Sequence, residues 1–286
     1  MDVIRDAVGI RAVTDAWRAA GQTLGFVPTM GALHGGHISL LRRARADHDR
    51  VVVSIFVNPL QFGDGEDLDR YPRDEPADLA VCETEGVDAV WAPPVEEVYP
   101  LGASLVRPDP GTVGDTYEGA ARPGHFAGVV QVVHRLFDVI GPSSAYFGEK
   151  DAQQLFLVRQ MAEEYPQLQV SVVGCPTQRE PDGLALSSRN AFLTAEERQQ
   201  APCLFLALTE AAERARGGER DANVLVAVMA REIGATELVR LDYAAVVDEA
   251  TFEPIRNIDG PARAIVAARF SNARLLDNLL LPEPAG

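Results

Sequence analysis

The chain has 286 residues, 47% of them hydrophobic, and a formal net charge of −16 at pH 7. Its length allows one large domain or two smaller ones, and its composition is ordinary for a globular protein. The negative charge argues against nucleic acid as the main partner, because phosphate backbones need a basic surface. No apolar run is long enough to suggest a membrane span, and residues 1–21 lack the apolar core of a secretion signal, so we expect a cytoplasmic protein without a membrane partner.

The scarce cysteines and lysines are also informative. Cys82, Cys175 and Cys203 lie far apart without a C-x-x-C pair, which argues against a zinc site or a disulfide framework. Of the 26 basic residues, only Lys150 is a lysine. A compact ammonium on a flexible stem can reach between phosphate oxygens in a way that a planar guanidinium cannot. Chance is the alternative explanation, since a single lysine must stand somewhere.

Helices and strands alternate through the first two thirds of the chain. The hydrophobic pattern predicts a helix at residues 3–20, a strand at 23–27, a helix at 36–47, a strand at 50–57, a helix near 76–85, a strand at 88–92, a buried helix at 128–140, a strand at 144–147, a helix at 152–164 and a strand at 170–173. Strand, loop, helix and strand form a βαβ unit, which requires a parallel sheet. The fold class is therefore α/β, with a Rossmann-like doubly wound parallel sheet.

The pattern changes after residue 179. Thr194 and Glu197 form a capping-box signature before a predicted helix at 195–216, which the glycine pair at 217–218 ends. A helix at about 221–233 and strands at 238–247 and 262–270 follow. We therefore expect two domains, a Rossmann-like domain at residues 1–179 and a smaller C-terminal α+β domain at residues 180–286.

The segment at residues 26–41, FVPTMGALHGGHISLL, carries the most informative local pattern. A predicted strand ends near Pro28, a loop of small residues follows, and His34 and His37 stand three apart before a predicted helix. With His37 in the first helical turn, its imidazole, the backbone N–H groups there and the helix dipole would all favour a phosphate chain. A capped or solvated surface pair of histidines is the alternative reading of this short motif.

Two further polar motifs follow predicted strands. They are Asn58-Pro59-Leu60-Gln61 and Gly148-Glu149-Lys150-Asp151. Ligands of open α/β sheets bind beyond the carboxyl ends of the strands, so we expect these motifs and the 28–37 loop to meet in one cleft.

Five blocks of the chain, in this order and spacing, closely resemble the pantoate–β-alanine ligase family. They are PTMGALHGGH at 28–37, FVNPLQF at 56–62, EGAARPGHFAG at 118–128, FGEKDAQQL at 147–155 and GLALSSRN at 183–190. The resemblance covers nearly the whole chain. The His-x-Gly-His motif alone would also fit the wider superfamily of nucleotidyltransferases and class I aminoacyl-tRNA synthetases.

The resemblance implies an ATP-dependent condensation of (R)-pantoate with β-alanine in two steps. The pantoate carboxylate attacks the α-phosphorus of ATP, giving pantoyl adenylate and pyrophosphate; the amine of β-alanine then attacks the acyl carbon and AMP leaves. Catalysis of such a reaction depends mainly on positioning the reactants and on hydrogen-bond donors that neutralise the developing charge. The resemblance also implies a homodimer, a nucleotidyltransferase type of sheet domain that binds ATP and pantoate, a C-terminal lid domain, and Mg²⁺ bridging the phosphates.

Matching positions suggest the residues that bind ATP. His34, His37 and Lys150 are the expected catalytic residues. The histidines would stabilise charge on the transferring phosphate, with His37 as a proton donor in the alternative reading, and Lys150 would contact the β- and γ-phosphates. The expected ATP-binding set comprises Pro28, Thr29, Met30, Gly31, His34, His37, Gly148, Glu149, Lys150, Asp151, Gln178, Leu186, Ser187, Ser188 and Arg189. Asp151 is also the expected, indirect Mg²⁺ ligand.

Matching positions also suggest the residues that bind pantoate. Gln61 and Gln154 are expected to hold its hydroxyl and carboxylate oxygens, with Asn58 nearby, while Met30 and Phe62 would form apolar walls. Taken without the family pattern, these glutamines would be read as solvated and the methionine as core filler.

Other matching positions have no settled role. Arg122 either orders a loop or touches substrate, and His125 is expected to be structural. Tyr71 would line the entrance for nucleotide or β-alanine. Two positions depart from the family pattern: Gly35 replaces a frequently acidic residue, which loosens the first helical turn, and Gln178 replaces an aliphatic residue near the adenine.

Two other functions compete with ligation. A nucleotidyltransferase acting on a phosphorylated acceptor would share the histidines and the sheet but would not need Gln61 and Gln154. A non-catalytic nucleotide-binding regulator would keep the fold and lose the phosphate-binding residues, all of which are present here.

Overall fold

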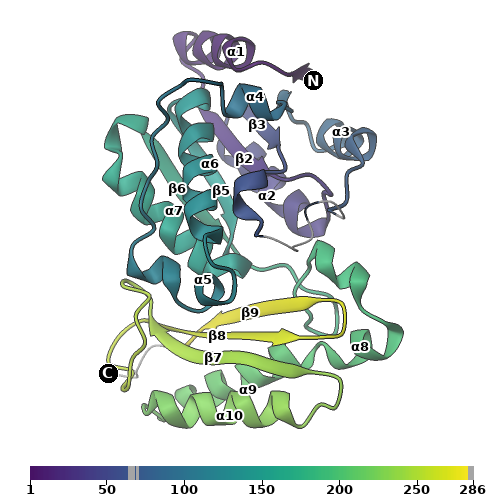
Figure 1. Ribbon diagram of the computed structural model, residues 1–286, viewed down its shortest axis with the longest axis vertical. Coiled ribbons are helices and arrows are strands. Elements are labelled where there is room, and N and C mark those ends of the chain that lie inside the picture. Colours follow the sequence, from purple (N-terminus) through teal and green to yellow (C-terminus); the bar gives the residue numbers. More distant parts are fainter. Residues whose placement is uncertain (64–67, 69–70, 283–286) are drawn as a thin grey trace. The chain divides into compact units, whose positions relative to one another are not determined.

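The computed structural model describes residues 1–63, 68 and 71–282. The chain divides into two compact units (Figure 1): unit 1 is formed by residues 1–149 and 153–176, and unit 2 by residues 150–152 and the chain from 177 onward. The predicted domain boundary at 179/180 stays a prediction. No helix among the described residues is long and apolar enough to cross a membrane.

Unit 1 is built on a parallel sheet. Among the described residues the strands are β1 (Asp2–Ile4), β2 (Leu24–Thr29), β3 (Arg50–Ile55), β4 (Ala89–Trp91), β5 (Ser143–Gly148) and β6 (Val170–Cys175), in the order β1-β4-β3-β2-β5-β6. Every strand pair is parallel. The longer helices are α1 (Ala7–Ala19), α2 (Gly35–Asp47), α3 (Glu75–Thr84), α6 (His125–Ile140) and α7 (Ala152–Glu164). The predicted Rossmann-like doubly wound sheet is confirmed.

Short helices connect these elements. They are η1 (Pro59–Gln61), α4 (Val95–Val98), η2 (Thr112–Asp115), α5 (Glu118–Ala121), η3 (Glu149–Asp151) and η4 (Pro166–Leu168).

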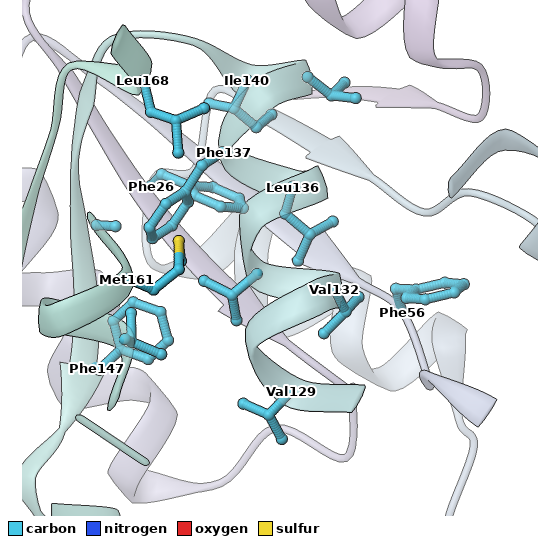
Figure 2. Packing of buried hydrophobic residues seen from close by; sticks show 14 of the residues in the cluster. Phe26, Phe56, Val129, Val132, Leu136, Phe137, Ile140, Phe147, Met161 and Leu168 are labelled. Carbon is cyan, nitrogen blue, oxygen red and sulfur yellow. The ribbon is translucent and has the colours of Figure 1, made fainter. Parts of the chain in front are cut away.

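Successive residues of each strand face two different cores. Phe26 packs in a core with α1, α6 and α7, whereas its neighbour Val27 packs in a core with α2 and α3. Figure 2 shows Phe26 beside Phe137 of α6, with ring centroids 6.3 Å apart. Nearly all of α6 is buried, as its apolar sequence predicted. Burial of both sheet faces explains why the strands are continuously apolar.

Unit 2 is an α+β unit. Its antiparallel sheet has the order β7-β8-β9, from Arg240–Asp248, Ala262–Arg269 and Arg274–Leu280. The helices are η5 (Ser188–Phe192), α8 (Ala195–Gln200), α9 (Cys203–Arg216) and α10 (Ala222–Gly234). Helices α9 and α10 cover the sheet through a core that includes Leu204, Leu208 and Met229 (Figure 1).

Three local predictions were wrong. Residues 2–4 form strand β1 beside β4 and precede helix α1, because a three-residue strand is too short to show a periodicity. The predicted helix at 195–216 is broken at Pro202, which lacks the N–H that a continuous helix needs. Strand β9 was not predicted, because its sequence RLLDNLL does not alternate cleanly between apolar and polar residues.

The change in strand order falls between β2 and β5. From β2 the chain builds β3 and β4 on one side and then returns to add β5 and β6 on the other. The ladder between β2 and β5 contains the pairs Gly25–Ser144 and Phe26–Ala145 and does not continue to Thr29 and Gly148, where the two strands end. Such a switch point, at the carboxyl ends of the strands, is where open α/β sheets bind ligands.

The buried histidine of α6 predicts a pH dependence of stability. Burial lowers the pKa of His134 from its ordinary 6.5, and within the described structure its Nε2 has no hydrogen-bond partner. Near the ordinary pKa of histidine, the unfolded chain therefore binds more protons at this residue than the folded protein does. The free energy of unfolding should fall as the pH decreases from about 7.5 to 5.5.

We expect His134→Phe to reduce this fall, because phenylalanine keeps a ring against Tyr165, 4.7 Å away between centroids, and does not titrate. Urea unfolding at several pH values measures the effect. His48, whose pKa burial also lowers, accounts for a remaining part of the slope. Parallel curves for wild type and variant would contradict the assignment to His134.

Candidate active site

A buried carboxylate from α3 holds the loop that follows β2. Asp78 Oδ2 accepts a hydrogen bond from Ala32 N at 3.0 Å, and Oδ1 accepts one from Leu33 N at 2.7 Å. Gly31 and Ala32 have left-handed backbones, with φ of 79° and 52°. A Cβ at Gly31 would also lie 2.7 Å from Asp78 Oδ2. Glycine is therefore required at 31, and Asp78 offsets the backbone strain of the loop.

The loop leads directly into the two histidines. His34 is the N-cap of α2, and its Nδ1 accepts a hydrogen bond from Gly36 N at 3.1 Å. The Nδ1 of His37 accepts one from His34 N at 3.3 Å, which completes a reciprocal capping box. The ring centroids are 4.3 Å apart. Both imidazoles thus lie at the N-terminus of α2, where the helix dipole favours an anion.

Thr29 links this loop to the neighbouring strand. Its Oγ1 donates to Ser54 O at 2.8 Å and accepts from Gly31 N at 3.2 Å. Pro28 and Thr29 are the last residues of β2, and the half-buried Met30 follows them. The predicted ATP-binding residues 28–31 thus stand at the carboxyl end of β2.

Two buried amide side chains, those of Asn58 and Gln61, lie on the connection that follows β3, and one of them contacts Met30. Asn58 Nδ2 donates to Gln61 Oε1 at 3.2 Å and to Gly128 O at 3.0 Å, and Tyr99 Oη donates to Asn58 Oδ1 at 2.8 Å. The Nε2 of Gln61 lies 3.2 Å from the Sδ of Met30. The structure therefore brings together Met30, Asn58 and Gln61, three of the residues predicted to bind pantoate.

The block at 118–128 fixes the backbone of Gln61. Arg122 donates to Gln61 O at 3.3 Å and to His125 Nε2 at 3.0 Å, and His125 Nδ1 donates to Gln61 O at 2.9 Å. A Cβ at Gly128 would lie 2.3 Å from Leu60 O, so only glycine allows α6 to approach this closely. Within unit 1, Arg122 and His125 therefore position a loop.

Two further predicted pantoate-binding residues are Phe62, which follows η1, and Gln154, which lies in α7. Phe62 packs edge-on against the buried Tyr71, with centroids 6.1 Å apart. Gln154 is half-buried near the start of α7. Its neighbour Gln153 is buried and donates to Val113 O at 2.7 Å, so the first of the two glutamines is structural.

Lys150 and Asp151 belong to unit 2. The Lys150 side chain is 18% exposed and that of Asp151 48%, with Nζ and Oδ1 3.7 Å apart. The backbone oxygen of Lys150 accepts a hydrogen bond from Asn278 Nδ2 at 2.8 Å. Arg263 in turn donates to Asn278 Oδ1 at 2.6 Å. A buried polar residue of β9 thus anchors the backbone of the single lysine.

The segment 178–190 forms a hairpin-like loop in unit 2. Leu186 N donates to Gln178 O at 2.9 Å, so these two predicted nucleotide contacts face each other. Ser187 caps η5 by accepting from Arg189 N at 3.2 Å, and Ser188 begins that helix. At the base of the loop, Arg179 forms a bidentate ion pair with the buried Asp277, at 2.6 and 2.9 Å.

No group of three or more His, Cys, Asp or Glu residues that could hold a metal ion occurs within residues 1–63, 68 and 71–282. Asp151 stays the predicted indirect ligand.

Sequence reasoning missed several residues that support the site. Asp78, Tyr99, Gln153 and Asn278 are buried or half-buried polar residues that bond to the site or to its backbone. Asp78 and Asn278 are polar residues inside apolar stretches, and Gln153 stands in the block at 147–155 without an assigned role. No spacing rule connects Asp78, Tyr99 or Asn278 to the motifs. The expected meeting of all motifs in one cleft involves both units and stays a prediction.

Comparison with known proteins identifies the family. A family model described as Pantoate-beta-alanine ligase matches residues 2–280. The chain belongs to this family. The pantothenate synthetase of Rubrobacter xylanophilus is 49% identical over 98% of both chains, and that of Chloroflexus aggregans is 53% identical over 92% of this chain and 95% of the relative.

Solved structures agree with the family assignment. The pantothenate synthetase of Thermus thermophilus matches with a TM-score of 0.91 and 46% identity, covering 99% of this chain and 100% of that one. A pantoate-beta-alanine ligase from Francisella tularensis, complexed with beta-gamma ATP and beta-alanine, matches with a TM-score of 0.78 and 32% identity over 98% and 97% of the two chains. The predicted family, fold and enzyme class are confirmed: the chain is a ligase of pantoate and β-alanine.

The contacts of Asp78 generate a testable expectation. We expect Asp78→Ala to lower the free energy of unfolding by about 2 kcal/mol, because two backbone N–H groups lose a charged acceptor. Turnover should fall as well, since the loop before His34 loses its support. Urea unfolding and steady-state kinetics measure the two effects.

Asp74 provides a matched control on the same helix. It caps α3 by accepting from Ala77 N, and its side chain has no hydrogen bond to residues 30–33 within the part of the chain that the structure describes. Asp74→Ala should cost about 1 kcal/mol of stability and leave turnover near wild type. Equal losses of turnover in both variants would contradict a specific role for Asp78.

Proposed function

We propose that the enzyme activates (R)-pantoate as pantoyl adenylate at the carboxyl ends of β2 and β5, and that β-alanine then displaces AMP. One observation carries the proposal. Two imidazoles and the first N–H groups of α2 stand at the end of β2, beside the switch point of the sheet. That arrangement suits a polyphosphate, and the Francisella tularensis relative was solved with beta-gamma ATP and beta-alanine.

His34 and His37 stabilise charge in the first step. The pantoate carboxylate attacks the α-phosphorus, the bond to the bridging oxygen breaks, and pyrophosphate leaves with the negative charge. Donors placed in advance at the end of α2 lower the energy of this transition state without reorganising. Residues 28–31, together with Gly148 and Glu149 at the end of β5, form the part of the ATP site that unit 1 supplies.

Pantoate is held by amides next to this loop. Gln61 and Gln154 offer neutral donors and acceptors to its hydroxyl and carboxylate groups, which leaves the carboxylate nucleophilic. Asn58 is 1% exposed and orients Gln61. Met30 and Phe62 supply the apolar surface for the two methyl groups.

Unit 2 supplies the remaining ATP contacts. Lys150 binds the β- and γ-phosphates, and Ser187, Ser188 and Arg189 donate to phosphate oxygens. Gln178 and Leu186 contact the nucleotide base through their backbone. A bound Mg²⁺ would neutralise phosphate charge, and Asp151 is the residue that would hold it indirectly. Residues 180–286 act as a lid, and a cytoplasmic homodimer is the expected form of the enzyme.

Substrate dependence tests this function. AMP should form only when pantoate, β-alanine and ATP are all present. Exchange of labelled pyrophosphate into ATP should need pantoate but not β-alanine, because the adenylate forms first. Exchange that also requires β-alanine would contradict an adenylate intermediate, and a product made from a phosphorylated acceptor without amine would favour a nucleotidyltransferase.

Lys150 provides a test of the phosphate contacts. We expect Lys150→Ala to lower kcat about 10²- to 10³-fold, the loss typical of one transition-state donor. Lys150→Arg should also lose most activity, because a planar fork does not replace a point charge between phosphate oxygens. A near-normal rate for the arginine variant, measured by AMP release, would contradict the point-charge argument.

Arg122 provides a test of the pantoate contacts. We expect Arg122→Ala to raise KM for pantoate about 10-fold, because the backbone of Gln61 loses a charged donor, and to leave KM for ATP nearly unchanged. Arg73, another arginine of unit 1 that donates to Leu68 O, is the control position, and Arg73→Ala should leave KM for pantoate nearly unchanged. Similar changes in both KM values would contradict a specific effect on pantoate.

A further inference from the structure

A buried glutamine near the start of α7 holds the segment that precedes α5. Gln153 is 5% exposed. Its Nε2 donates to Val113 O at 2.7 Å and to Thr116 O at 2.9 Å, and its Oε1 accepts a hydrogen bond from Glu118 N at 3.1 Å. Both hydrogens of the amide and its oxygen therefore have backbone partners, and a flipped amide would place its oxygen against two carbonyl groups.

These hydrogen bonds enclose a residue with an unfavourable backbone conformation. Tyr117 has a φ of 46° and a ψ of −104°, and residues with a side chain rarely adopt a positive φ. Gln153 binds the peptide groups on both sides of it, through Thr116 O and Glu118 N. Tyr117 is also the N-cap of α5, and its own side chain makes no capping hydrogen bond. Gln153 thus supplies a cap for α5 from another helix and holds the strained residue in place.

The capped helix leads directly to the residues that support Gln61. At the end of α5, Arg122 N donates to Glu118 O at 2.9 Å, and His125 N donates to Arg122 O at 3.0 Å. The side chains of Arg122 and His125 both bind the carbonyl of Gln61. A change in the backbone at Tyr117 would therefore move, within about one helical turn, the groups that hold Gln61.

We propose that Gln153 is a positioning residue for pantoate, because it sets the distance between Gln61 and Gln154. It acts through the strained backbone of Tyr117. Gln154 follows Gln153 in α7, so the helix that carries one expected pantoate contact also holds the segment that positions the other. All of these residues belong to unit 1. The inference rests on the proposed function, because Gln61 and Gln154 are the residues proposed to bind pantoate, and a ligand held at two points needs a fixed distance between them.

Steady-state kinetics of Gln153→Ala test the position of the pantoate contacts. We expect KM for pantoate to rise about 10-fold, because Gln61 loses its fixed support. KM for ATP and kcat should stay within about 3-fold of wild type, because the end of β2 and the start of α2 do not depend on this segment. Equal rises of both KM values would overturn the proposal.

Thr14 provides a matched control for the loss of a buried hydrogen bond. It is fully buried in α1, and its Oγ1 donates to Ile140 O at 3.1 Å, at the end of α6 opposite to His125. Thr14→Val should lower the midpoint of urea unfolding and leave KM for pantoate within about 2-fold of wild type. If Thr14→Val raised this KM as much as Gln153→Ala, a general loss of stability would explain both effects and the proposal would fail.

Two substitutions of Tyr117 test the role of the strained backbone. Tyr117→Gly and Tyr117→Ala both remove the phenol ring, but only glycine adopts a positive φ without a steric cost. We expect Gln153→Ala to raise KM for pantoate about 10-fold in the Tyr117→Ala protein and no more than about 3-fold in the Tyr117→Gly protein. Equal factors in the two backgrounds would show that Gln153 does not act through this backbone.

Amide hydrogen exchange, followed by mass spectrometry, gives a readout that does not depend on activity. Glu118 N and Arg122 N are both hydrogen-bonded, so peptides that cover residues 113–122 should exchange slowly in the wild type. Gln153→Ala should speed their exchange at least about 10-fold and leave peptides from β5 unchanged. Unchanged exchange at residues 113–122 would overturn the proposal.

Failure of this inference is distinguishable from failure of the proposed function. If pyrophosphate exchange does not require pantoate, the proposed function fails, whereas hydrogen exchange still shows whether Gln153 holds residues 113–122. If hydrogen exchange rises in Gln153→Ala while KM for pantoate does not, the connection from this segment to Gln61 is refuted and the proposed function stands.

Discussion

Burial of a parallel sheet on both faces is the constraint on which the site depends. Phe26 and Val27 are neighbours in β2 but face separate cores, so the strand can neither slide nor rotate without losing both. This fixes the carboxyl ends of β2 and β5, which extend beyond the last pair of the ladder between them. The loops that begin there start from defined positions, and a site can be built on them.

Buried polar groups then hold those loops through the backbone. Asp78 binds two N–H groups beyond β2, Arg122 and His125 both bind the carbonyl of Gln61, and Asn278 binds that of Lys150. Each of these bonds fixes a stretch of backbone that carries or adjoins a predicted site residue. Because a buried polar group must be satisfied, losing one of these partners is costly, which makes the positions rigid.

The start of α2 is stabilised by two residues that are also predicted to be catalytic. A capping box normally uses Ser or Thr with Glu or Gln, whereas α2 uses His34 and His37. His34 and His37 stand three residues apart, at the predicted start of a helix. The same spacing allows the two reciprocal hydrogen bonds of the capping box.

The sequence by itself determined the family, the α/β class and most element positions, because periodicity and motif spacing are local properties. It also identified Met30, Asn58 and Gln61, which the structure places together. Only the tertiary structure decided that Arg122 and His125 support Gln61, that Asp78 supports the loop after β2, and that β1 and β9 exist. These depend on contacts between residues far apart in the chain, and no local pattern encodes which buried donor meets which acceptor.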